Sequence, residues 1–476
     1  MKTKLAGLWK CEGGIREVLV VAVPLILSCG AHTVQTFIDR LFLARLDNDA
    51  MSGAMLAGLC NFCFVSFLMG LVAYTSTFVA QYGGAGRPER IGPSVWQGGY
   101  IAIISGLLGM LLLFVAEPLF GLIGHSESVQ AFEITYFKVM TFCVVPILLS
   151  TAFSCFYSGR GRTDVVMWIN ISVSFINIVL DYLLIFGHFG FPKLGVMGAA
   201  LATVIAMYFA VFTYIILFFR KKYDVMFHTR RGWRIDKDLM RRLLRYGLPN
   251  GFNFMLDMIN FTAFLAIIGR YNDLVQAAVS MVFSVNMIAF MPVVGIGMAV
   301  SIVVGKYLGM DRPENAVRSA WIGLTIGVSF MTFISLVYVF FGHILLQPFI
   351  ESASPENIET LRDISMKMLY FVALYSIADA VVIVFSSVLK GAGDTRFVMK
   401  VSFICGICLM VLPTWISVKL QLSYYAPWIA ITVFIFVLTI FFALRFKGGK
   451  WKDMRVIERH QPEIEEQNTI KEIAHV

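Results

Sequence analysis

The sequence predicts an all-α membrane protein whose twelve transmembrane helices form two six-helix lobes, related by a pseudo-two-fold axis along the membrane normal. Three observations support this fold. Hydrophobic residues make up 58% of the 476 residues and charged residues only 14%, whereas a soluble domain carries about 25% charge. Apolar runs long enough to cross a bilayer recur along the whole chain. An internal repeat divides these runs into two halves.

Hydropathy predicts six helices in each half of the chain. They lie near 17–40, 50–82, 95–116, 137–158, 164–187 and 196–219, then near 247–269, 275–305, 319–341, 367–389, 397–418 and 427–446. The stretch between the two sets is rich in Lys and Arg. We therefore expect a lobe over 1–219, a basic linker over 220–246, a second lobe over 247–447 and a solvated or partly helical tail over 448–476.

The distribution of cations predicts the orientation. With the N-terminus in the cytoplasm, most of the 39 Lys and Arg fall on that side, and the longest loop on the opposite side, 347–363, is acidic. The positive-inside rule then places both termini in the cytoplasm, in a multi-pass protein of the cell (inner or plasma) membrane. The net charge of +9 is explained by this topology, so we expect no nucleic-acid partner.

The internal repeat is visible in two similar segments. Gln81-Tyr-Gly-Gly-Ala-Gly-Arg-Pro-Glu resembles Lys306-Tyr-Leu-Gly-Met-Asp-Arg-Pro-Glu, 225 residues later, and the same offset relates Pro24 to Pro249. Six helices per repeat give both halves the same orientation, as in alternating-access transporters built from parallel repeats. No GxxxxGK[ST] phosphate loop and no HExxH zinc motif is present. We therefore expect no enzyme activity, no cofactor, and transport driven by an ion gradient.

Ionisable residues inside apolar helices are the candidate functional groups, because a charge at the bilayer centre costs about 2.5–3.5 kcal/mol. Asp39, Asp181, Asp257 and Asp379 lie in such helices, and no mid-helix Lys or Arg offsets Asp257 or Asp379. Each is a candidate to carry a proton or, with other oxygen ligands, to bind Na⁺. His32 follows Pro24 by eight residues, as Asp257 follows Pro249, and is a further candidate proton site. Hydrogen-bonded packing between helices is the alternative for all of them.

The spacing of Asn177 and Asp181 predicts a shared helix face, since residues four apart are neighbours on a helix. If Asp39 meets that face, two carboxyl groups and a carboxamide converge. Two carboxylates that close require a shared proton or a bound cation. The alternative is a polar packing cluster that never exchanges an ion, and a salt bridge from Arg40 to Asp39 would move the coupling role to Asp257 and Asp379.

Several of these features together resemble the multidrug and toxic compound extrusion (MATE) family over nearly the whole chain, to about Lys447. They are the duplicated twelve-helix plan, the two repeated loops, the pair of segments Ser158-Gly-Arg-Gly-Arg-Thr and Lys390-Gly-Ala-Gly-Asp-Thr, and an Asp-x-x-Phe-x-Ala pattern at Asp39–Ala44. Jointly they make the match specific.

The resemblance implies two sets of cation-coupling residues. In the second lobe they are Asp257, where many relatives have Glu, with Tyr375 and Asp379, which are also implied to contact substrate. In the first lobe they are Asp39, Asn177 and Asp181, a candidate Na⁺ site, with Thr203 as a further ligand.

The function implied is antiport, in which entry of Na⁺ or H⁺ drives export of organic cations by alternating access. Amphipathic cations and the lipid bilayer are the expected partners, and we expect a monomer. Two alternatives are a flippase for lipid-linked oligosaccharides, whose pyrophosphate cargo would need cations in the cavity, and a membrane receptor or scaffold that transports nothing.

Overall fold

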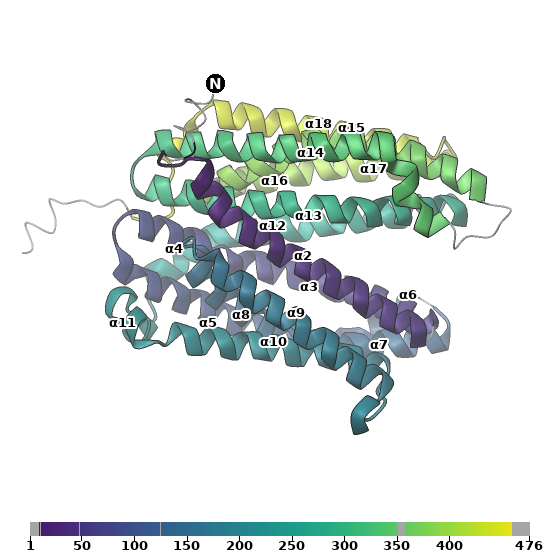
Figure 1. Cartoon of the computed structure of the whole chain (residues 1–476), viewed down its shortest axis with the longest axis horizontal. Helices are drawn as coiled ribbons and strands as arrows, with labels where there is room; N and C mark the ends of the chain where they lie inside the picture. The colour runs from purple at the N-terminus through teal and green to yellow at the C-terminus, as the bar shows by residue number, and fades with distance from the viewer. Residues whose placement is uncertain (1–8, 10, 47, 124, 351–357, 459–476) are drawn as a thin grey trace, which may run out of the picture.

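The computed structural model describes residues 9, 11–46, 48–123, 125–350 and 358–458, and within these ranges it is helical, with no β-strand (Figure 1). In this part of the chain ten helices are long and apolar enough to cross a membrane, and the number reaches twelve if each of two bent helix pairs is counted as one span. A helix or a pair of helices lies at each of the twelve predicted places. The predicted all-α fold with two six-helix lobes is confirmed.

The first lobe, which we call the N-lobe, is built from the helices between Ile15 and Phe218. They are α2 (Ile15–Leu46), α3 (Asn48–Ala73), α4 (Thr75–Gly84), α5 (Ile91–Gly109), α6 (Leu112–Ile123), α7 (Glu127–Thr141), α8 (Val144–Ser158), α9 (Thr163–Phe186) and α10 (Val196–Phe218). Two predicted spans are bent, by 46° between α5 and α6 and by 41° between α7 and α8.

The second lobe, the C-lobe, follows the short helix α11 (Lys221–Phe227) and begins inside the stretch that the sequence predicts as linker. Its helices are α12 (Lys237–Ile268), α13 (Asp273–Gly309), α14 (Pro313–Ile350), α15 (Ile358–Ala392), α16 (Thr395–Cys405), α17 (Leu412–Lys419) and α18 (Ala426–Lys447). The predicted span near 397–418 contains a π-helical stretch, Gly406–Val411. Here a side chain on Gly406 would place its Cβ 2.1 Å from Asn260 Nδ2, so the widened turn lies where two helices approach closely.

The lobes contact each other through α2 against α13 and through α3 against α12. Small residues permit this approach, as is usual between membrane helices. A Cβ on Gly251 of α12 would lie 2.4 Å from the carbonyl oxygen of Phe67 on α3. Nearby, Asn250 Nδ2 donates to the carbonyl oxygen of Gly70 at 2.7 Å. The interface between the lobes therefore brings backbone against backbone.

The internal repeat appears as a reciprocal contact between the lobes. A Cβ on Gly84, at the end of α4, would lie 2.0 Å from the carbonyl oxygen of Lys306, and a Cβ on Gly309, at the end of α13, would lie 2.1 Å from that of Gln81. Gly84 and Gly309 are related by the offset of 225, and so are Gln81 and Lys306. The two repeats therefore make equivalent contacts with each other, as expected for two units related by a two-fold axis.

Both described chain ends lie on one side of the molecule (Figure 1). We call this side the terminal face, and it carries residues 11–14, the turns at 84–90 and 309–313, and residues 450–458. The tail is partly helical over Lys450–Asp453, as expected, with Lys450 and Asp453 exposed, whereas Trp451 and Val456 are buried against the lobes at 0% and 1% exposure. Residues 459–476 lie outside the described residues.

Candidate functional site

Four predicted site residues come together between three helices of the N-lobe. Helix α9 packs against both α2 and α10. Asn177 and Asp181, one helical turn apart on α9, are both buried at 0% exposure. Asp39 approaches them from α2 and Thr203 from α10. We call Asp39, Asn177, Asp181 and Thr203 the N-lobe carboxyl cluster.

The Asn177 carboxamide connects the members of this cluster. In the orientation that satisfies both of its ends, its nitrogen lies 3.2 Å from Asp39 Oδ1 and 3.3 Å from Asp181 Oδ2. Its oxygen then accepts from the Thr203 amide at 3.2 Å and from the Thr203 hydroxyl at 3.3 Å. In the opposite orientation its nitrogen donates to Thr203 Oγ1 at 3.3 Å, and its oxygen faces the two carboxyl groups. A 180° rotation of the Asn177 carboxamide therefore replaces the amide nitrogen, a donor, with the amide oxygen, an acceptor, next to the two carboxyl groups.

The carboxyl groups of Asp39 and Asp181 lie close to each other, since the Asn177 carboxamide is within 3.3 Å of an oxygen of each and the two groups interact directly. Because both are acceptors when ionised, they can remain this close only by sharing a proton or a bound cation. Asp181 Oδ1 is buried and has no hydrogen-bond partner in the described chain. The oxygens of two carboxyl groups, a carboxamide and a hydroxyl are the ligands that hard cations take. The cluster can hold either a proton or a cation such as Na⁺.

Arg40 forms no salt bridge with this cluster. Its side chain is exposed, and among the described residues no ion pair joins it to Asp39, although it interacts with Asp39 electrostatically. The salt bridge that would have moved the coupling role to the C-lobe is therefore not formed.

Two further α2 residues border the N-lobe carboxyl cluster. Gln35, which our sequence analysis missed, is buried at 4% exposure, lies 2.7 Å from the Asn177 carboxamide and accepts from Ser174 Oγ at 3.0 Å. Its position four residues before Asp39, on the same helix face, is the signal that could have found it. His32 interacts with Gln35 and electrostatically with Asp39. The predicted His32 therefore lies next to the cluster.

The predicted C-lobe residues have a more open arrangement. Asp257 on α12 is exposed and accepts from Asn253 Nδ2 at 3.4 Å. Lys390, at the end of α15, interacts electrostatically with Asp257. Lys390 lies in the last turn of α15, so it does not contradict the prediction that no mid-helix Lys or Arg offsets Asp257, but it brings a cation from a helix end into electrostatic range of this carboxyl group.

Asp379 and Tyr375 lie one turn apart on α15. Tyr375 is buried at 3% exposure and Asp379 is half-buried. Asp379 interacts electrostatically with Asp257 and with Tyr375. In the described part of the chain, however, no hydrogen bond joins Asp379 to either of them. We call Asp257 and Asp379 the C-lobe acidic pair.

A multidentate site for a transition metal is not formed by the residues that the structure describes. Within these ranges no group of three or more His, Cys, Asp or Glu side chains could hold a metal ion. The N-lobe carboxyl cluster, which has two carboxyl groups, instead relies on neutral oxygens for any further ligands. Such a site suits a monovalent ion.

The comparison with protein families gives one match that covers most of the chain. The family model MatE matches residues 24–183 and 249–416, which are one segment in each lobe. The repeat that we infer from the sequence is therefore also the repeat that the family model recognises.

Curated relatives match over almost their full length. The "Probable multidrug resistance protein NorM" of Bradyrhizobium diazoefficiens is 27% identical over 435 residues, which cover 90% of this chain and 92% of that protein. The "Multidrug resistance protein NorM" of Burkholderia vietnamiensis is 26% identical over 381 residues, which cover 80% of this chain and 82% of that protein.

Solved structures share the fold. A MOP superfamily transporter from Pyrococcus furiosus superposes with a TM-score of 0.84 at 18% sequence identity, covering 94% of this chain and 98% of that one. A structure described as the outward-facing conformation of a multidrug resistance MATE family transporter superposes with a TM-score of 0.83 at 18% identity, covering 93% and 98%.

Proposed function

The chain belongs to the MATE family of multidrug and toxic compound extrusion transporters, to which the MatE model assigns both lobes, and on that premise we propose that it is an antiporter. It exports organic cations in exchange for Na⁺ or H⁺ by alternating access. The NorM relatives, named as multidrug resistance proteins, support the drug-export part of this proposal.

The N-lobe carboxyl cluster is the observation that carries the proposal. Asp39 and Asp181 lie close together inside a lobe, with the Asn177 carboxamide between them and Thr203. Asp181 Oδ1 has no hydrogen-bond partner among the described residues, so this oxygen can accept a bond from a proton-carrying group or bind a cation. Two carboxyl groups that need a proton or a cation form a site whose occupancy follows the ion gradient.

The Asn177 carboxamide gives this occupancy a mechanical consequence. With its nitrogen toward Asp39 and Asp181, it donates to both carboxyl groups and links them to α10 through Thr203. A bound cation favours the opposite orientation, in which the amide oxygen becomes a ligand. Arrival or departure of the ion thus changes the bonds that hold α2, α9 and α10 together. Since α2 also packs against α13 of the C-lobe, the change reaches the interface between the lobes.

We place the terminal face in the cytoplasm of a cell with this protein in its cell membrane. The Lys- and Arg-rich stretch 220–245 leads into α12 at this face, and the positive-inside rule assigns such segments to the cytoplasm. The reciprocal contact at Gly84 and Gly309 closes the molecule on this side. The described arrangement is then one in which access from the cytoplasm is closed, and a monomer suffices for the transport cycle.

Lys390 favours one alternative, the flippase for lipid-linked oligosaccharides, because an anionic cargo needs a cation in its path. Its interaction with Asp257, however, offsets its charge within the described structure. The C-lobe acidic pair thus leaves this region with more carboxylates than cations, which suits a cationic substrate.

Efflux from proteoliposomes tests the proposal. Ethidium efflux is measured under a sodium gradient alone and under a proton gradient alone, in the wild type and in Asp39→Asn and Asp181→Asn. Asp363→Asn, an exposed carboxylate paired with Lys367 at 2.6 Å, is the control. One gradient should drive efflux in the wild type and the control but not in the two cluster variants. If the rate of ethidium efflux by the wild type does not change when either gradient is applied, antiport is refuted.

A further inference from the structure

The tail segment 450–458 connects both lobes across the terminal face. Trp451 is buried, and its indole nitrogen donates to the Phe446 carbonyl oxygen at 2.9 Å, which fixes the segment to the end of α18. Arg455 then pairs with Asp311 of the C-lobe at 3.0 Å. One residue later, the Val456 amide donates to Gln81 Oε1 of the N-lobe at 2.9 Å. The segment therefore begins on one lobe and ends on the other.

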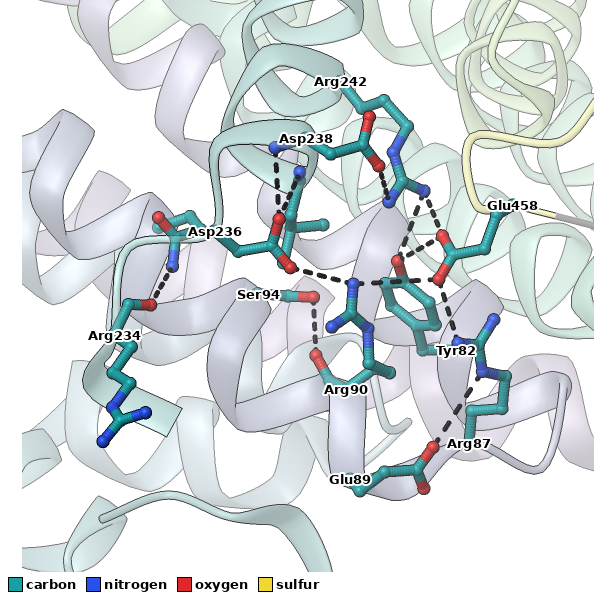
Figure 2. Close-up of polar contacts among 12 residues, drawn as sticks. Tyr82, Arg87, Glu89, Arg90, Ser94, Arg234, Asp236, Asp238, Arg242 and Glu458 are labelled. Atoms are coloured by element: carbon teal, nitrogen blue, oxygen red, sulfur yellow. Dashed lines mark hydrogen bonds and ion pairs between the residues drawn. The ribbon is translucent and has the colours of Figure 1, made fainter. Parts of the chain in front are cut away.

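Glu458, the last residue described, lies at the centre of a network of polar contacts (Figure 2). Tyr82 donates its hydroxyl hydrogen to Glu458 at 2.8 Å. Arg87 and Arg90 lie 3.0 Å and 3.7 Å from the carboxylate, and Arg242 forms an ion pair with it. A tyrosine and three guanidinium groups thus converge on a single carboxylate.

These cations are held in place by neighbours, as Figure 2 also shows. Asp236 accepts from Arg90 at 3.0 Å, and it caps α12 by accepting from the amides of Asp238 and Leu239. Asp238 pairs with Arg242 at 2.7 Å. The Arg242 side chain is only 16% exposed, so its charge is screened less than a surface charge. The arrangement is a preformed receptor for a carboxylate.

This receptor is composed of both lobes. Tyr82, Arg87 and Arg90 belong to α4 and the turn after it, whereas Arg242 belongs to α12. Within the described structure, the only other ion pairs of these three arginines are with Asp236, Asp238 and Glu89. The Glu458 carboxylate therefore pairs at once with Arg87 and Arg90 of the N-lobe and with Arg242 of α12.

The internal repeat shows what Glu458 replaces. At the pseudo-symmetric place, Tyr307 donates to Glu17, and Lys306 pairs with Glu17 at 2.7 Å. Tyr82 and Tyr307 are related by the offset of 225, and so are Arg242 and Glu17. The first repeat therefore has a carboxylate built into α2, where the second repeat has a cation in α12. The tail brings the missing carboxylate from outside the repeat.

We propose that Arg87, Arg90, Arg242 and Tyr82 form a carboxylate-binding site whose ligand is Glu458, and that this pairing, which we call the Glu458 clasp, holds the two lobes together on the terminal face. The clasp must open before the lobes can separate there. This inference rests on the proposed alternating access, but its test measures a distance and not transport. Failure of the clasp and failure of antiport can therefore be told apart.

The charge state of the clasp is permanent under physiological conditions. Burial raises the pKa of the Glu458 carboxyl, but hydrogen bonds from its own backbone amide, Tyr82 and Arg242 outweigh that effect and bring the pKa down to about 2. Arginine does not lose its charge near neutral pH. Opening of the clasp must therefore come from movement of the lobes and not from titration of Glu458.

The test measures the distance between two spin labels across the terminal face. Labels are attached at Arg162→Cys in the N-lobe and Glu314→Cys in the C-lobe, two exposed positions, in the full chain with its eight native cysteines replaced. In Glu458→Gln the population with a longer distance should rise at least threefold over the wild type. Arg87→Gln should shift it in the same direction. An unchanged distance distribution in both variants would overturn the proposal.

Glu89→Gln is the matched control, because Glu89 lies on the same face but within the described ranges forms an ion pair only with Arg87, at 3.9 Å. It should leave the distance distribution unchanged. An increase equal to that of Glu458→Gln would show that any lost charge loosens this face, and would contradict a specific site.

The repeat offers a rescue that a general structural role would not produce. Arg242→Glu places a carboxylate where the first repeat has Glu17. In the double variant Arg242→Glu/Glu458→Gln, that carboxylate can accept from Tyr82 and pair with the N-lobe arginines. The longer-distance population should return to within about twofold of the wild type. If the longer-distance population of the double variant equals or exceeds that of Glu458→Gln, Glu458 does not play the part that Glu17 plays in the other repeat.

Discussion

In the N-lobe the carboxyl groups of Asp39 and Asp181 share one closed cluster, whereas in the C-lobe Asp257 and Asp379 stand apart. Asp181 and Asn177 are fully buried, and Asp257 is exposed. In the described chain neither Asp39 nor Asp257 forms an ion pair, and each has one Lys or Arg in electrostatic range, Arg40 for Asp39 and Lys390 for Asp257. Buried oxygens that converge suit a small ion, and separated, accessible carboxylates suit a larger organic cation.

This contrast assigns a different role to each lobe. We propose that ion exchange takes place at the N-lobe carboxyl cluster, where the Asn177 carboxamide lies within about 3.3 Å of Asp39, Asp181 and Thr203. We propose that the C-lobe acidic pair, whose two carboxyl groups share no hydrogen bond in the described chain, attracts the exported cation. The contact of α2 with α13 links the two regions. Variants in the two lobes should therefore fail in different ways.

The largest effect is expected from Asp181→Asn. Without this carboxyl group the cluster keeps one negative charge and no longer needs a shared proton or cation. Coupling between two ligands is typically worth about 1–3 kcal/mol, or about 5–150-fold in affinity. We expect the effect of the coupling ion on ethidium affinity, measured by equilibrium titration with and without the ion, to disappear. Coupling that persists in both Asp181→Asn and Asp39→Asn would remove the cluster from the mechanism.

A smaller effect of another kind is expected from Asp379→Asn. The protein should fold and keep the response to the ion, but ethidium affinity should fall about tenfold, which is about 1.4 kcal/mol. Titration at two ion concentrations separates the two effects. If Asp379→Asn loses the ion response and keeps its ethidium affinity, the roles of the lobes are reversed.

Lys390→Gln tests the cation that offsets Asp257. Removing Lys390 takes away a cation that interacts with the Asp257 carboxylate, so ethidium affinity should rise about twofold to fivefold, the range expected for an electrostatic interaction worth about 0.4–1 kcal/mol. Lys367→Gln is the control, because Lys367 pairs with Asp363 on its own helix. A fall in affinity would mean that Lys390 shapes the substrate site in some other way.

The smallest effect is expected from pH on the Glu458 clasp. Because the folded pKa is about 2, below its usual value of 4.5, the clasp contributes fully above pH 4.5 and weakens only as the pH falls toward 2. The spin-label distance in the wild type should therefore not change between pH 5 and 8 through this group. If the wild-type distance does change over this pH range and the change is lost in Asp39→Asn, the change originates in the N-lobe carboxyl cluster. If it is lost in Glu458→Gln instead, Glu458 titrates in this range, which contradicts the permanent charge of the clasp.

The sequence predicts the helices and the repeat because their signals are local. Apolar runs specify the spans, and the similar segments at Gln81 and Lys306 predict the symmetric contact between the lobes. The Asn177 and Asp181 pair follows from helical spacing alone. Bringing Asp39 to that pair requires the packing of α2 on α9, which the sequence does not encode locally and which only the family resemblance implied.

Two features were beyond sequence reasoning for physical reasons. From the sequence, a lysine at a helix end such as Lys390 is expected only to indicate the orientation of the helix, and its electrostatic interaction with Asp257 follows from the tertiary arrangement of the C-lobe. Glu458 lies in a polar tail without hydrophobic periodicity, where nothing in the sequence distinguishes it from the other acidic residues. The partners of Glu458 are brought together only by the fold. The equivalence of Arg242 and Glu17 can be recognised only when the structure shows Arg242 next to Tyr82 and Glu17 next to Tyr307.

The most direct test of the assignment of ion exchange to the N-lobe is to count ions released when ethidium binds. Calorimetric titration in buffers of different ionisation enthalpy gives the protons released, and titration at several sodium concentrations gives the Na⁺ released. The wild type and Asp257→Asn should release the same ion, and Asp39→Asn and Asp181→Asn should release none. Release that persists in both cluster variants and disappears in Asp257→Asn would place ion exchange in the C-lobe and contradict this account.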